Sequence, residues 1–198
     1  AQIGVLRPED ALALCAVGPT IRASGIKRDV RADDPYLAYD EIPLEVITYE
    51  GCDVLSRLLL RCDELVESIN IIRYAVEQLP EGETRMKVPR KVPEGEAVGR
   101  VEAPRGELIH YARTNGTTKP ERYMLRCPTL ANIPSVCKML VGGYIADIPI
   151  VLAGIDPCFA CMDRMAFVDE CKNKRWAWSG EELRKYAIKW YKGKKKIP

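Results

Sequence analysis

Residues 53–79 read DVLSRLLLRCDELVESINIIRYAVEQL, and this stretch decides the fold. Its apolar residues recur with the 3.6-residue period of an α-helix, which predicts one helix over the whole stretch. Asp53 is suited to cap the helix N-terminus, and Pro80-Glu81-Gly82 ends it. The apolar positions are Leu55, Leu58, Leu59, Cys62, Leu65, Val66, Ile69, Ile72, Ala75, Val76 and Leu79, and the opposite face carries Arg57, Arg61, Glu64, Glu67 and Arg73.

Shorter elements flank this helix on both sides. We expect helices over residues 8–15, 129–140 and 179–191, and strands over residues 42–49, 101–112, 122–127 and 148–155. A capping box of Ser179 and Glu182 opens the last helix. The segment 21–39 has many charged residues and little apolar period, so we expect an ordered loop held by ion pairs.

Composition sets outer limits on the function. The 198-residue chain is 47% hydrophobic and carries 30 basic and 28 acidic side chains, so it can bury a core and is not mainly disordered. A net charge of +2 argues against a dedicated nucleic-acid binder, although Lys192–Lys196 is locally basic and most simply a solvated tail. The longest apolar run is strand-sized, well short of the roughly 20 residues that cross a bilayer.

Eight cysteines form the most unusual part of the composition. The usual companions of a secreted disulfide scaffold are missing, so the thiols indicate a reducing, cytoplasmic compartment. The chain begins at Ala1 directly before a helix start, which indicates a fragment, a processed chain or one half of a split protein.

Cys158 and Cys161 form the sharpest local motif, a C-x-x-C pair after the apolar run. This spacing brings two sulfurs to one side of a turn, where they can bind one metal ion or each other. Four interpretations stay open: a structural zinc site, a thioredoxin-like dithiol, half of a larger thiolate site completed from outside the chain, or a buried pair without a role. Zinc needs four ligands, yet the remaining cysteines form no second close pair and His110 is the only histidine.

A second motif runs from Val101 to His110 and centres on Pro104-Arg105-Gly106. By itself it predicts a strand with a bend, in which Arg105 is a salt-bridge partner of Glu102 or Glu107. Beside a dithiolate, the fixed fork of guanidinium donors would instead orient small anionic ligands and stabilise negative charge on sulfur.

The two motifs in this order, E-A-P-R-G (102–106) with His110 and then D-P-C-x-x-C-x-x-R (156–164), resemble the large subunit of [NiFe]-hydrogenases in its C-terminal half. Arg164, in place of the more usual histidine, resembles the membrane-bound, energy-converting branch. The segments 18–25, 28–31 and 126–129 are similar to the 49 kDa subunit of respiratory complex I, in the same superfamily. This resemblance implies a mainly α fold with a small antiparallel β element. It also implies a hydrogenase-like part over 1–169 and a basic tail with a helix over 170–198.

The resemblance assigns roles to matched positions. Cys158 and Cys161 would be metal ligands, the second thiolate pair of a Ni–Fe centre, and soft thiolates suit both metals. Arg105 would lie over that centre as a catalytic residue. Pro104 and Thr129 would be cofactor-binding residues that line its wall. The other thiolate pair belongs to the N-terminal half of the large subunit, so this chain supplies half of the ligands.

The resemblance also implies partners and a reaction. These are an iron–sulfur small subunit with a [4Fe–4S] cluster, ferredoxin as electron source, and membrane antiporter-like subunits. The chain would belong to the peripheral arm on the cytoplasmic side of the cell membrane, with protons reduced to hydrogen and coupled ion pumping. Related hydrogenase precursors are cut after the position of Arg164, whereas residues 165–198 follow it here. We therefore keep two alternatives: a nickel-free relative that reduces sulfane sulfur or polysulfide, and a non-catalytic structural subunit of a complex I-like assembly.

Overall fold

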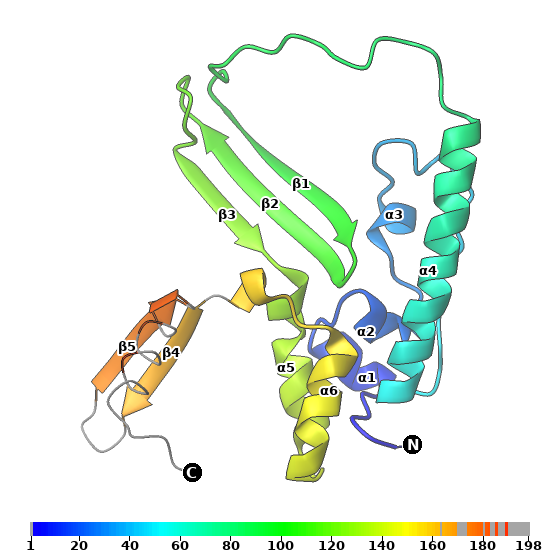
Figure 1. Ribbon diagram of the computed structural model, residues 1–198, viewed down its shortest axis with the longest axis vertical. Helices are drawn as coiled ribbons and strands as arrows, with labels where there is room; N and C mark the ends of the chain where they lie inside the picture. Colours follow the sequence, from blue (N-terminus) through cyan, green and yellow to red (C-terminus); the bar gives the residue numbers. More distant parts are fainter. Residues whose placement is uncertain are drawn as a thin grey trace. The chain divides into compact units, whose positions relative to one another are not determined.

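The computed structural model describes residues 2–162, 164–169 and 174–179, together with residues 181, 182, 185 and 189. The chain divides into two compact units, residues 1–157 and residues 158–198 (Figure 1). The predicted division at residue 169 into a hydrogenase-like part and a basic tail stays a prediction.

The first unit contains six α-helices, one 3₁₀ helix and one sheet. In chain order these are α1 (Pro8–Ala13), α2 (Pro19–Arg22), α3 (Val30–Asp33), α4 (Val54–Glu77), β1 (Gly95–Ala103), β2 (Gly106–Thr114), β3 (Arg122–Arg126), α5 (Pro128–Leu140), η1 (Ile145–Asp147) and α6 (Ile148–Ile155). The strands form an antiparallel sheet in the order β1-β2-β3. The predicted mainly α fold with a small antiparallel β element is confirmed.

The second unit contains η2 (Phe159–Met162) and an antiparallel hairpin of β4 (Arg164–Asp169) and β5 (Lys174–Ser179). The predicted capping box is confirmed: the Glu182 backbone N–H donates to Ser179 Oγ, and the Ser179 backbone N–H donates to the Glu182 carboxylate at 2.8 Å. Most of the predicted helix over 179–191 lies outside the described residues.

The core of the first unit lies where α1, α2, α5 and α6 meet. Pro8, Pro19 and Pro128 each stand in the first turn of a helix, where a missing N–H costs nothing. The fully buried apolar side chains there are Leu6, Ala11, Ala16, Ile21, Val136, Met139, Val151 and Ile155. This core anchors the ends of the helices from which the site side chains project.

Two predicted strands are wrong. Residues 148–155 form α6, because a short apolar run fits a buried helix as well as a strand and Pro149 stands in the first helical turn. Residues 42–49 pair with no strand: the backbone N–H of Glu45 donates to the Glu67 carboxylate of α4, and that of Tyr49 donates to the carbonyl of Arg22.

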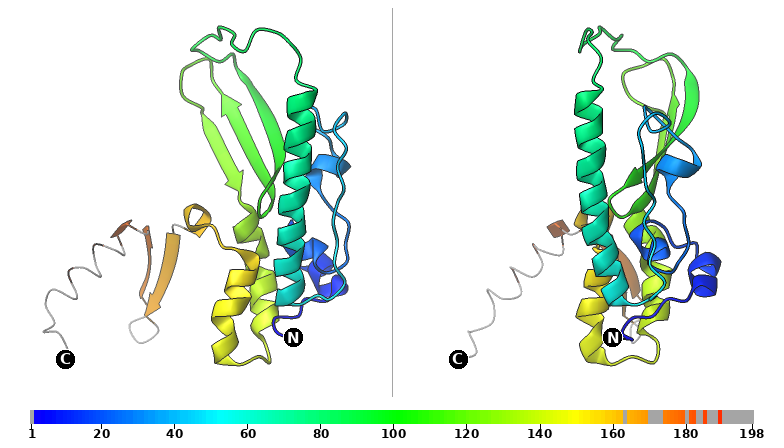
Figure 2. Two further views of the ribbon diagram at one scale, coloured as in Figure 1. Left: turned by 45° about the vertical axis from the view of Figure 1, so that its right-hand side comes forward. Right: turned by 90° about the vertical axis from the view of Figure 1, so that its right-hand side faces the viewer.

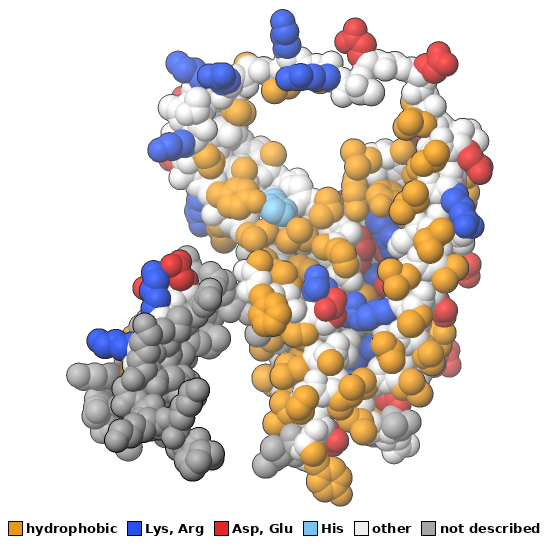
Figure 3. All heavy atoms as spheres, in the orientation of Figure 1, with side chains coloured by type: hydrophobic (Ala, Val, Ile, Leu, Met, Phe, Trp, Pro, Cys, Tyr) orange, Lys and Arg blue, Asp and Glu red, His pale blue; other side chains and the backbone are white. Residues whose placement is uncertain are grey.

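The long helix α4 turns its polar face toward the interior. Asp53 caps it through the backbone N–H of Ser56, as predicted. Arg57 is completely buried, whereas Leu65 is 66% exposed and Val76 is 69% exposed. Hydrophobic side chains therefore lie along the outside of α4, as Figure 3 shows, and Figure 2 shows the helix standing along one side of the unit. Among the described residues, no helix is long and apolar enough to cross a membrane.

A long exposed loop, residues 78–94, joins α4 to β1. Its far end is held to the β2–β3 turn, because the Thr114 hydroxyl donates to the Pro93 carbonyl at 2.5 Å. The loop itself has no regular secondary structure.

Candidate functional site

The β1–β2 hairpin carries Arg105 at its tip. Ala103 pairs with Gly106, so Pro104 and Arg105 are the two turn residues. The bend predicted within a strand over 101–112 is therefore a complete reversal between β1 and β2. Gly106 makes the reversal possible, since its φ of +125° is one that other residues rarely adopt. A Cβ atom on Gly106 would lie 2.7 Å from the backbone nitrogen of Gly18. The tip therefore rests directly on the backbone that begins α2.

Arg105 forms an ion pair with Asp156 at the C-terminal end of α6. Its Nη2 lies 3.0 Å from Asp156 Oδ2, and its Nε donates to the backbone carbonyl of Asp156. The predicted pairing of Arg105 with Glu102 or Glu107 is wrong, since other arginines engage both carboxylates. Asp156 has a left-handed backbone (φ 54°), a conformation that aspartate tolerates better than most residues. It stands two residues before Cys158 in the chain.

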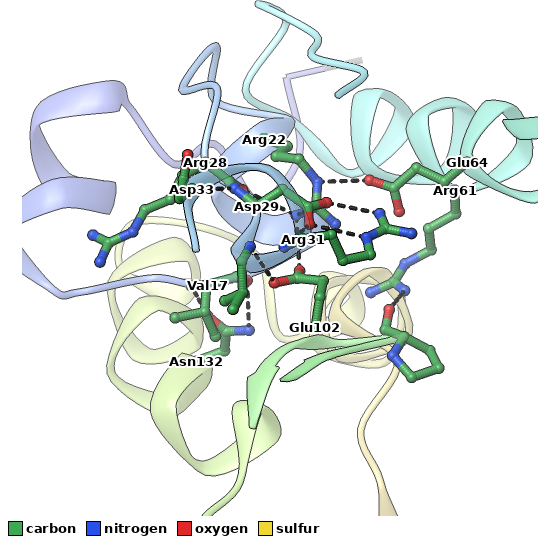
Figure 4. Close-up of polar contacts among 12 residues, drawn as sticks. Val17, Arg22, Arg28, Asp29, Arg31, Asp33, Arg61, Glu64, Glu102 and Asn132 are labelled. Atoms are coloured by element: carbon green, nitrogen blue, oxygen red, sulfur yellow. Dashed lines mark hydrogen bonds and ion pairs between the residues drawn. The ribbon is translucent and has the colours of Figure 1, made fainter. Parts of the chain in front are cut away.

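Behind the hairpin lies a buried charge cluster, which we define as Arg22, Asp29, Arg31, Glu64 and Glu102 (Figure 4). Arg22, only 2% exposed, is its centre: Nε lies 2.7 Å from Glu64, and Nη1 lies 2.8 Å from Glu102 and 3.2 Å from Asp29. Arg31 closes the cluster with a second bond to Asp29 at 2.7 Å. Three carboxylates and two guanidinium groups thus compensate one another's charge at largely buried positions, as buried charges require.

The pKa values of the two most buried carboxylates of the cluster, Asp29 and Glu102, shift in opposite directions. Burial pushes the pKa of Asp29 upward, but hydrogen bonds from Arg31 and the charge of Arg22 outweigh it, and the pKa falls below its usual value. Burial raises the pKa of Glu102 above its usual value, and Arg22 only partly opposes that rise. The carboxylates raise the pKa of Arg22 in spite of its burial. Of these two carboxylates, Glu102 is therefore the easier to protonate.

A pocket of about 380 Å³ opens between this cluster and the hairpin tip. Its wall includes Arg22, Arg31, Arg61, Glu64, Glu102 and Pro104. The volume accommodates on the order of ten water molecules. A chamber whose lining combines apolar surface with charged side chains, next to the turn that carries Arg105, can hold small ionic species or pass protons.

Thr129 and its neighbours on α5 support the same region from below. Thr129 lies in the first turn of α5 and is 1% exposed. One turn later, the amide of Asn132 donates to the Val17 carbonyl at 3.1 Å and accepts from the Val17 backbone N–H at 3.0 Å. Val17 precedes Gly18, so α5 fixes the segment on which the hairpin tip rests.

Cys158 and Cys161 belong to the second unit and Arg105 to the first, so each is described within its own unit. The backbone N–H of Cys161 donates to the Cys158 carbonyl at 3.0 Å, and both residues are half-buried. Side chains three positions apart on a 3₁₀ turn point to the same side. Among the described residues, no group of three or more His, Cys, Asp or Glu side chains is placed to hold a metal ion. The metal-binding role of the two cysteines stays a prediction.

Sequence reasoning misses the inward role of Arg61 and Glu64. The periodicity predicts both only as part of the charged face of the long helix. The available signal is their spacing with Arg57, since three charged residues at helical intervals share one face. The sequence does not say which face of an amphipathic helix turns inward when both are well formed.

The sequence and the fold of the chain match a known class of respiratory subunit. The sequence profile of the family described as respiratory-chain NADH dehydrogenase, 49 Kd subunit, matches residues 1–92 and 84–164. The chain therefore belongs to that family, as predicted.

Individual relatives come from hydrogenases and from NADH-quinone oxidoreductases. The chain is 41% identical to formate hydrogenlyase subunit 5 of Escherichia coli, over 94% of this chain and 33% of that protein. It is 36% identical to membrane-bound hydrogenase subunit alpha of Pyrococcus furiosus (86% and 44%). It is 42% identical to a subunit of the NADH-quinone oxidoreductase of Desulfitobacterium hafniense (82% and 45%). The chain thus spans between a third and just under half of the length of these relatives.

A solved structure is similar as well. It is that of the membrane-bound sulfane sulfur reductase, an archaeal respiratory membrane complex. The TM-score is 0.72 at 36% sequence identity, and the match covers 79% of this chain and 44% of that one. The chain is therefore an oxidoreductase-family subunit of the hydrogenase and NADH-quinone oxidoreductase type.

Proposed function

We propose that this chain forms part of the large subunit of a membrane-bound, ferredoxin-dependent oxidoreductase that reduces protons to hydrogen. The observation that carries the proposal is Arg105, which is held by a glycine-dependent turn and by Asp156, two residues before Cys158 in the chain. The hydrogenase relatives support it at the level of the family. In this reaction two electrons from a [4Fe–4S] cluster in a small partner subunit combine with two protons.

In the proposed site, Cys158 and Cys161 hold half of a Ni–Fe centre, which, when bound, supplies the redox chemistry. Arg105 presents guanidinium donors to small anionic ligands, and its fixed fork suits that task. Pro104 lines the wall of the pocket, and we propose that Thr129, in the first turn of α5, lines the wall of the centre. The charged side chains of the pocket behind the hairpin would hold protons before they are consumed.

A second candidate reaction is the reduction of sulfane sulfur or polysulfide by a nickel-free relative. The similarity to the sulfane sulfur reductase structure favours it. Two electrons would then break one S–S bond, and the two sulfur fragments would take up protons. The two cysteines would serve as redox-active thiols or as remnants. The third candidate is a non-catalytic structural subunit that transmits redox change to an ion-pumping arm.

The partner proposals follow from the outward apolar face of α4. The exposed apolar row on α4 is larger than a lone soluble domain usually shows. Four of its side chains are more than half exposed: Leu58, Leu65, Ile72 and Val76. We propose that the N-terminal half of the large subunit covers it, because the relatives are about twice as long as this chain or longer. Membrane antiporter-like subunits and ferredoxin complete the proposed assembly, on the cytoplasmic side of the membrane.

The deciding experiment uses the intact complex supplied with reduced ferredoxin. Nickel and iron contents are measured together with hydrogen evolution and with sulfide release from polysulfide. Stoichiometric nickel with hydrogen evolution that is lost in Cys158→Ser and Cys161→Ser supports the first reaction. Sulfide release without nickel supports the second. Cys137→Ser, an exposed thiol on α5, is the matched control. If no turnover changes in either cysteine variant, the catalytic proposals fail and the structural role gains.

A further inference from the structure

Arg61, on the second turn of α4, reaches two segments that are far apart in the chain. Its Nη2 donates to the backbone carbonyl of Ile155 at 3.0 Å. Its Nη1 donates to the backbone carbonyl of Pro104 at 3.4 Å (Figure 4). The same Nη1 lies 3.9 Å from Asp156 Oδ2. One guanidinium therefore joins the hairpin tip to the last turn of α6.

These contacts surround the ion pair of the candidate site. Arg105 is held by Asp156. Arg61 binds the carbonyl that precedes each of these two residues in the chain, that of Pro104 and that of Ile155. Arg61 is 20% exposed, and its burial lowers the pKa of the guanidinium, with the charge of Asp156 opposing that change. The half-buried Arg61 donates to two backbone carbonyls. Its main effect is therefore to hold the hairpin tip and the end of α6 in place rather than to neutralise a carboxylate.

The neighbouring Arg57, one turn earlier, offers a contrast. It is completely buried, and burial lowers its pKa to about 10. Its donors go to the carbonyls of Cys52 and Gly4, in the N-terminal layer of the unit rather than at the hairpin. Arg57 is thus a structural arginine on the same helix, well suited to serve as a control.

We propose that Arg61 is a positioning residue that sets the hairpin tip against the end of α6 and so aims the Arg105 guanidinium. This inference rests on the proposed function for its catalytic consequence, though its structural part stands without it. Arginine is required because its planar fork reaches two carbonyls at once, whereas lysine offers a point charge on a flexible stem.

The structural part is tested by hydrogen exchange in the intact complex. In Arg61→Met, peptides covering residues 101–108 and 152–157 should both exchange about tenfold faster, the change expected when hydrogen bonds to a charged group are lost. Arg61→Lys should give a smaller change and keeps the test valid if the methionine variant folds poorly. Arg57→Lys, whose native side chain packs against Gly154 of α6, should leave the 101–108 peptide unchanged. Unaltered exchange of these peptides in both Arg61 variants would overturn the proposal.

The catalytic part is tested by a double-mutant cycle with Arg105→Lys. Alone, Arg61→Met should lower kcat about 100-fold with little effect on KM, the scale expected when a reacting group is misplaced by about 1 Å. In the Arg105→Lys background the same change should cost far less, because Arg61 acts through Arg105. Losses that simply multiply would refute this mechanism. If Arg105→Lys alone changes no turnover, the proposed function fails, and the exchange result still decides the structural part.

Discussion

Replacing Arg22 by methionine is the most direct test of the buried charge cluster. The side chain is 2% exposed and contacts three carboxylates at 2.7–3.2 Å, as well as the backbone carbonyl of Arg28 at 3.0 Å. Methionine keeps most of the volume and removes the positive charge. Asp29 and Glu102, which are 1% and 4% exposed, then lose the cation that compensates them.

The cost follows from leaving those charges buried. Removing one partner of a buried ion pair destabilises a protein by about 3–5 kcal/mol. For a chain of this size that corresponds to a Tm lower by about 6–20 °C. The loss should shrink at acidic pH, where Glu102 accepts a proton and no longer needs the cation. Adding Glu102→Met to Arg22→Met should recover part of the loss, since one orphaned charge is gone.

Thermal unfolding followed by circular dichroism at pH 7 and pH 4.5 measures these effects. The matched control is Arg113→Met, which removes an exposed ion pair with Glu121 at 2.8 Å on the sheet surface. Exposed pairs contribute little, so the control should hardly shift Tm. A Tm of Arg22→Met equal to that of the control would refute the reasoning, as would a double variant less stable than the single one.

Three further predictions concern other parts of the chain. Asp29→Asn should lower Tm most at neutral pH. The pKa of Asp29 in the folded chain lies below its ordinary value of 3.8, so the stability that the carboxylate contributes is present above that value. This stability is lost as the pH falls through the folded pKa. The difference in Tm between the variant and the natural chain should therefore disappear in strong acid. Gly106→Ala should lower the free energy of unfolding by roughly 1–3 kcal/mol from the strained backbone alone, and by more because of the contact with Gly18. The control Gly99→Ala, whose Cβ meets nothing within 4 Å, should have only a small effect. Equal urea midpoints for the two variants would contradict this prediction. The double variant Ile69→Glu and Ile72→Glu should leave the Tm of the chain nearly unchanged, since both side chains are about half exposed. The same variant should no longer co-purify with the N-terminal half of the large subunit. Retained co-purification would argue against that interface.

Local patterns predict much of the fold. The helix over 53–79 is readable because its period, N-cap and terminating proline all agree, and α4 has those bounds within two residues. The apolar run over 148–155 misleads, because eight apolar residues in succession carry no period that separates strand from helix. The reversal at Pro104-Arg105 is hidden because its turn glycine is needed for a contact with Gly18, which is distant in the chain.

The candidate site is only partly predictable. Arg105 and the cysteine pair stand out by motif, and ion pairs are expected in the segment 21–39, where Arg22, Asp29 and Arg31 indeed pair. Their partners on other elements, Glu64 on α4 and Asp156 after α6, are not predicted. An ion pair between distant segments produces no periodic pattern in the sequence. The roles of Pro104, Thr129, Cys158 and Cys161 stay predictions.

The loop over 78–94 has a practical consequence for laboratory work. Its residues are exposed, it lies outside both the charge cluster and the α-helical core, and the two family matches overlap within it. Insertions are tolerated best at such places. An affinity tag or a fluorophore introduced there would report on the subunit within its native assembly while leaving the chemistry of the hairpin undisturbed.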